Sequence, residues 1–111
     1  MIGIVALLAG CSQPAADIES QIDALYDKMS MEERIAQLRS GYMDELFDSE
    51  GNLDTALCRQ MIPYGIGHFS QYASQKPTDP NVLRDRVAAM QDWLMRNTPN
   101  GIPALFHEEV L

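Results

Sequence analysis

The chain has 111 residues, of which 46% are hydrophobic and 22% charged, and its formal net charge is -8 at pH 7. This length fits one small domain or part of a larger one, and the composition is that of a globular protein. The acidic balance excludes nucleic acid as a partner, because no basic stripe is present to neutralise phosphates. It also excludes electrostatic attachment to an anionic membrane, whereas a neutral polyol such as a sugar is compatible with it.

The first eleven residues are apolar and uncharged, and they end in Leu8-Ala9-Gly10-Cys11. An apolar run of about eight residues fits the core of a signal peptide and is too short to span a bilayer. The four residues resemble the bacterial lipobox, in which the cysteine is lipidated, so residues 1–16 are predicted to be a lipoprotein signal and a flexible tether. No Lys or Arg precedes the run, and a buried first strand is the alternative. The lipobox hypothesis predicts a periplasmic or outer-membrane lipoprotein whose membrane attachment is Cys11.

The second cysteine, Cys58, stands among apolar residues. This setting is typical of a small buried side chain rather than a reactive thiol, and neither cysteine has neighbours at metal-ligand spacing. Acids cluster before Gly51, but aligning this glycine with an EF-hand loop places Leu46 and Leu57 at the first and last ligand positions. Residues 42–52 are therefore predicted to be a solvated loop, and we expect no metal and no cofactor.

Helical patterns occupy the first half of the chain. Residues 17–29 have apolar side chains at helical spacing. Ser30 and Glu33 form an S-x-x-E capping box, which predicts a second helix that ends near Gly41 and has Met31, Ile35 and Leu38 on its apolar side. A third, short helix is predicted to follow its N-cap at Asp54 and to run through residue 61.

The second half predicts a strand, a helix and a strand. Residues 64–70 indicate a short strand entered through glycines, without the third glycine of a dinucleotide fingerprint. Asp79-Pro80 begins a helix that runs to about residue 97, and residues 102–106 start another strand. This order is the βαβ unit of a parallel α/β fold. Such a sheet needs both faces covered, so we expect the truncated start of a barrel or open sheet.

The candidate site follows the last predicted strand, at His107, Glu108 and Glu109. Functional residues of parallel α/β folds lie where strands end, and alternation should send Glu108 to one face and the other two to the opposite face. A carboxylate there could bind sugar hydroxyls, act as an acid or base, or bind a metal. The alternative is that the acids are solvated and His107 is a polar neighbour. His68, predicted at the end of the earlier strand, is more often structural in such a setting.

Three segments resemble, in order and spacing, the opening of glycoside hydrolase family 3: residues 22–38, the Gly-Ile-Gly-His-Phe-Ser sequence at 65–70, and the Asn-Gly-Ile-Pro-Ala-Leu-Phe-His-Glu-Glu-Val-Leu sequence at 100–111. The family includes β-glucosidases and β-xylosidases. The resemblance implies that residues 17–111 begin a (β/α)8 TIM-like barrel, preceded by helices and followed in the whole protein by an α/β sandwich domain.

The family resemblance also implies a mechanism. Its members are exo-acting and retain the anomeric configuration, through two carboxyl groups about 5 Å apart. The nucleophile and the acid/base residue would lie downstream, so this chain alone should be inactive and the substrate would be a β-linked gluco- or xylo-configured glycoside. Glu109 aligns with the acid that binds sugar hydroxyls in subsite -1. Glucosidases usually have Asp there, and Glu is more similar to the xylosidase side. Glu108, His107 and His68 are site neighbours without a family role.

Two other hypotheses compete with the glycosidase. The chain could be a small lipoprotein that serves as a binding or interaction module without catalysis. A metal-dependent hydrolase that uses His107, Glu108 and Glu109 is the least favoured hypothesis, because it has too few ligands.

Overall fold

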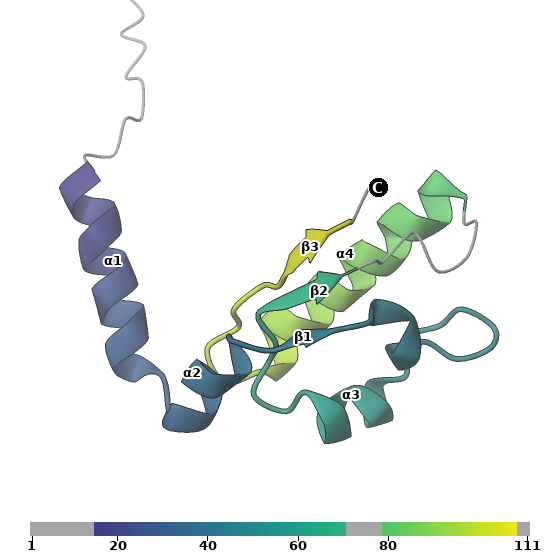
Figure 1. The fold of residues 1–111 in the computed structure, drawn as a ribbon, viewed down its shortest axis with the longest axis horizontal. Helices are drawn as coiled ribbons and strands as arrows, with labels where there is room; N and C mark the ends of the chain where they lie inside the picture. Colours follow the sequence, from purple (N-terminus) through teal and green to yellow (C-terminus); the bar gives the residue numbers. More distant parts are fainter. Residues whose placement is uncertain (1–14, 71–78, 109–111) are drawn as a thin grey trace, which may run out of the picture.

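The computed structural model describes residues 15–70 and 79–108. The predictions for Cys11 and Glu109 therefore lie outside the described residues. In chain order the elements are α1 (Ala15–Lys28), α2 (Met31–Ala36), β1 (Ser40–Gly41), the 3-10 helix η1 (Met43–Leu46), α3 (Thr55–Met61), β2 (His68–Ser70), α4 (Pro80–Asn97) and β3 (Leu105–His107) (Figure 1).

The strands form a parallel sheet in the order β1-β2-β3. Gly41 pairs with Phe69, and Phe69 pairs with Phe106. Helix α4 connects β2 to β3 and lies along one face of the sheet (Figure 1). In the described residues, β2, α4 and β3 form the predicted strand-helix-strand unit with parallel strands, and the barrel stays a prediction.

The hydrophobic core lies between this sheet face and the helices. Phe69 of β2 is 1% exposed, and Met90 and Leu94 of α4 are fully buried. The apolar side of α4 that includes Met90 and Leu94 is thus the surface that packs on the sheet. The other core members are Met43, Leu46, Cys58, Ile62, Ile66, Trp93 and Ala104. Cys58 is completely buried, as its apolar neighbourhood predicts.

The helix starts follow the capping residues in the sequence. The Asp79 carboxylate accepts a bond of 2.7 Å from the Asn81 N–H at the start of α4, and Asp54 accepts bonds from two N–H groups of α3. Both halves of the predicted capping box between Ser30 and Glu33 are formed at α2. These side chains satisfy N–H groups that have no partner inside the helix.

The prediction that the second helix ends near Gly41 is wrong. Helix α2 ends at Ala36, and Ser40–Gly41 is the first strand of the sheet. The Ala36 carbonyl accepts a bond from the Gly67 N–H at 3.1 Å, so the chain leaves the helix to pair with the approach to β2. Leu38, expected on the apolar side of the helix, is 84% exposed in the turn that follows.

The prediction of a solvated loop over residues 42–52 is wrong in its first half. Residues 43–46 form η1, in which Met43 is fully buried and Leu46 is 4% exposed. Because Asp44 and Glu45 stand between Met43 and Leu46, the sequence shows no apolar pattern here that would predict a helix. The second half is a turn in which Asp48 accepts bonds from the N–H groups of Asn52 and Glu50. These hydrogen bonds lower the pKa of Asp48, and the bond from the Asn52 N–H makes the largest contribution.

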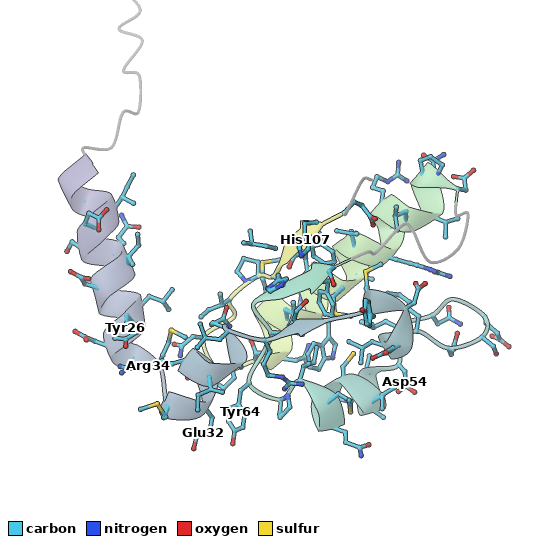
Figure 2. The ribbon with its side chains drawn as sticks, viewed as in Figure 1. Tyr26, Glu32, Arg34, Asp54, Tyr64 and His107 are labelled. Atoms are coloured by element: carbon cyan, nitrogen blue, oxygen red, sulfur yellow. The ribbon has the colours of Figure 1, made fainter. Side chains whose placement is uncertain are left out.

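Helix α1 is formed as predicted and projects away from the sheet (Figure 1). Its apolar positions are exposed, with Ile18 at 50% and Ile22 at 54%. Arg34 of α2 connects the two helices through Tyr26 of α1 (Figure 2). Its guanidinium lies 3.9 Å from the centre of the Tyr26 ring and donates a hydrogen bond of 2.9 Å to the Tyr26 carbonyl. Among the described helices, none combines the length and the apolar character that a membrane crossing requires.

Candidate functional site

One face of the sheet is packed on helices, and the opposite face carries polar side chains together with the exposed Leu105. Phe69 lies on the packed face, and alternation along each strand places its neighbours His68 and Ser70 on the other. Ser70 pairs in register with His107, and its hydroxyl lies 3.4 Å from that of Ser40 on the next strand. The open face therefore carries hydroxyl and imidazole groups from all three strands.

The two histidines meet on this open face. The ring centres of His68 and His107 are 5.2 Å apart, with the planes inclined by 38°. His68 is half-buried and His107 is exposed. His107 is the last residue of β3, so it lies at the carboxyl end of the strand, where the site is predicted, whereas His68 is the first residue of β2 and not at its end. Strand β2 begins later than the glycine-rich approach suggests. In the parallel register His68 pairs with Leu105 and His107 pairs with Ser70, so the two histidines are diagonal neighbours on the same face.

A close backbone approach fixes where β2 begins. A Cβ atom on Gly67 would lie 1.9 Å from the Gln37 carbonyl oxygen, so only glycine fits between β2 and the end of α2. The His68 N–H donates to the Arg39 carbonyl at 3.3 Å. The glycine-rich entry that the sequence predicts thus allows a close backbone contact at Gly67.

The start of β3 is held by the side chain of Gln91 on α4. Its Nε2 donates to the Ala104 carbonyl at 2.7 Å, and its Oε1 accepts from the Ala104 N–H at 2.9 Å. The Leu105 N–H then donates to the Gly67 carbonyl at 3.0 Å. Sequence reasoning missed Gln91, because a half-buried amide on a helix has no pattern that reveals a partner on a strand.

A buried carboxylate links α2 to the turn before β3. Glu33 is 4% exposed; its Oε2 accepts from the Ser30 N–H at 2.9 Å and its Oε1 accepts from the Asn100 side-chain amide at 2.8 Å. The Ser30 N–H, with support from Asn100, holds the pKa of Glu33 below its usual range, although burial acts in the opposite direction. The capping box predicts the first of these contacts, but nothing in the sequence predicts the second.

The remaining predicted site residues cannot be joined into one cluster. Glu108 follows β3 and is half-buried. Glu109, predicted to bind sugar, lies outside the described residues, so its role stays a prediction. Within residues 15–70 and 79–108, no group of three or more His, Cys, Asp or Glu side chains could hold a metal ion. The described part of the site is therefore a polar strand edge with two adjacent imidazoles.

A separate hollow lies at the opposite end of the sheet. It has a volume of about 350 Å³ and is lined by residues of α2, α3 and the segments before β1 and β2. Glu32 and Tyr64 belong to this lining, and Figure 2 shows both well away from His107. Since the amino ends of the strands face this hollow, it is distinct from the predicted site at the carboxyl ends.

Comparison with known proteins relates the chain to a sugar-cleaving enzyme by name. Over an alignment of 101 residues the chain is 34% identical to a proposed β-xylosidase of Formosa agariphila, and the alignment covers 83% of this chain and 12% of that protein. The chain thus spans about an eighth of the length of this relative. No protein-family model matches the chain. The sequence relationship is glycosidase-like, and membership of glycoside hydrolase family 3 stays a prediction from the motifs.

Proposed function

We propose that the chain is the amino-terminal part of an exo-acting, retaining glycoside hydrolase of the family 3 type, and that its sheet begins a (β/α)8 barrel. The observation that carries the proposal is the polar open face that ends at His107, together with the similarity to a proposed β-xylosidase. In a barrel of this kind the helices cover the outside and the strand ends surround the site. The order β1-β2-β3, with α4 on one face only, fits that arrangement.

The proposed substrate is a β-linked glycoside of gluco- or xylo-configured sugars. Glu109 would bind sugar hydroxyls, since an ionised carboxylate accepts strong hydrogen bonds from them. His107, His68 and Glu108 would be its neighbours at the rim. The nucleophile and the acid/base residue belong to sequence downstream of this chain, where two carboxyl groups about 5 Å apart would support a covalent glycosyl-enzyme intermediate.

The direct test uses the full polypeptide, that is, this chain with any sequence continuous with it. It should hydrolyse 4-nitrophenyl β-xyloside or β-glucoside, and proton NMR should show the β-anomer as the first sugar released. The 111 residues alone should give no turnover, because they lack both catalytic carboxylates. Absence of hydrolysis by a folded full polypeptide, or initial release of the α-anomer, would contradict the proposal.

We also propose that Cys11 carries a lipid and that the protein is a periplasmic or outer-membrane lipoprotein. The support is the Leu8-Ala9-Gly10-Cys11 sequence after an apolar run. Labelled palmitate should enter the wild-type protein expressed in a bacterium but not the Cys11→Ala variant. Cys58→Ala is the matched control, since Cys58 is buried in the core. Equal labelling of wild type and Cys11→Ala would exclude the anchor.

A further inference from the structure

The paired imidazoles on the open sheet face have a spacing that suits metal coordination. A Zn–N bond of about 2.0–2.1 Å places the metal about 3.2 Å from each ring centre. Two imidazoles at a tetrahedral angle then have ring centres about 5.2 Å apart. The ring centres of His68 and His107 are 5.2 Å apart in the structure.

The position of the pair allows a dication to reach both rings. The side chains stand on adjacent, hydrogen-bonded parallel strands, so the sheet fixes their separation. His107 is exposed and His68 is half-buried, which leaves a path from solvent to both rings. The net charge of -8 attracts cations to the protein as a whole.

We infer that His68 and His107 form a two-imidazole site for a first-row transition-metal dication on the open face of the sheet. Imidazole suits Zn²⁺, Cu²⁺ and Ni²⁺, and the tetrahedral spacing of the two rings favours Zn²⁺, because Cu²⁺ and Ni²⁺ prefer tetragonal geometry. Mg²⁺ and Ca²⁺ prefer oxygen ligands and should not bind there. Two protein ligands leave the other coordination positions to water or to a bound molecule. This site goes beyond the proposed glycosidase activity and does not rest on it. It differs from the sequence-based expectation of no metal, which came from ligand spacing along the chain, because the two histidines meet across neighbouring strands.

The first test measures the Zn²⁺ affinity of the folded full polypeptide by titration calorimetry. Holding two ligands together raises affinity by about 10²-fold or more over a single ligand. His68→Asn and His107→Asn should therefore each weaken Zn²⁺ binding by about 10²-fold. Ser40→Ala, on the same face but two strands from β3, is the control and should bind like wild type. Wild-type affinity in both histidine variants would overturn the inference.

A second test needs no variant and reports on each residue separately. Diethyl pyrocarbonate modifies free imidazoles, and mass spectrometry assigns the product to the peptide that contains His68 or His107. Increasing Zn²⁺ should protect both residues over the same concentration range, whereas Mg²⁺ should protect neither. Protection of one histidine alone, or of neither, would show that the two rings do not share a metal.

Discussion

Glu33 provides a sharp test of how the site strand is positioned, because its carboxylate joins α2 to the turn before β3. Glu33→Ala removes the acceptor for the Ser30 N–H and for the Asn100 amide. A hydrogen bond to a charged group contributes about 1.5–3 kcal/mol, so we expect a loss of about 3 kcal/mol in the local stability of this region. Glu33→Gln should also lose stability, since its side-chain oxygen can accept from one of the two donors while its NH2 group faces the other.

The assay is amide hydrogen exchange of the full polypeptide, read by mass spectrometry on peptides that span residues 97–105. Of the two bonds, only that of Asn100 reaches residues 97–105, and its loss, about 1.5–3 kcal/mol, corresponds to roughly 10- to 10²-fold faster exchange through local opening. Glu32→Ala is the matched control, since Glu32 is the exposed neighbour in the same helix turn and its charge there contributes about 0.3–1 kcal/mol. Equal effects of Glu32→Ala and Glu33→Ala on residues 97–105 would refute the reasoning.

The pH dependence of the same measurement has a defined sign. The pKa of Glu33 is lowered in the folded state, so its contribution is fully present above the pKa of an unfolded Glu, about 4.3. The contribution is lost as the pH falls through the lower, folded-state pKa. The difference between wild type and Glu33→Ala should therefore be constant from pH 5 to pH 7 and shrink in stronger acid. A difference that grows in acid would contradict the assignment.

Three further predictions follow from contacts in the described residues. Gly67→Ala should abolish folding of the β2 approach, seen as lost near-UV circular dichroism, because its Cβ would meet the Gln37 carbonyl at 1.9 Å; native signal would contradict this. Cys58 should react with Ellman's reagent at pH 8 only after urea is added, since burial raises its pKa to about 11; rapid reaction in the native protein would disprove it. Gln91→Ala should lower the local stability of β3 by about 2 kcal/mol, because it removes two hydrogen bonds to Ala104. Amide hydrogen exchange at β3 measures this change, and unchanged exchange would show that the two bonds do not stabilise the strand.

The sequence predicts elements well where local chemistry decides them. Asp79 and Pro80 place the start of α4 correctly because capping and a first-turn proline act within one helical turn. The same holds for Asp54 at α3 and for the capping box at α2. The order of strand, helix and strand then follows from hydrophobic periodicity.

The errors lie where contacts between distant residues decide the structure. The residues of β1 continue a plausible helix in sequence, and only pairing with β2 makes them a strand. The contact between Glu33 and Asn100 joins residues that are 67 positions apart. The histidine pair likewise depends on strand register, which the sequence does not specify. Local patterns therefore predict which residues belong to the site, but not which of their side chains come into contact.

The central claim, that the carboxyl end of β3 forms the sugar-binding rim of a glycosidase barrel, is tested most directly by the kinetics of Glu109→Ala in the full polypeptide. Loss of hydroxyl contacts should lower kcat/KM on an aryl β-xyloside or β-glucoside by roughly 10²-fold, about 3 kcal/mol of transition-state stabilisation. Glu50→Ala, in the exposed turn before α3, should leave kcat/KM unchanged. Wild-type kinetics for Glu109→Ala would contradict the account.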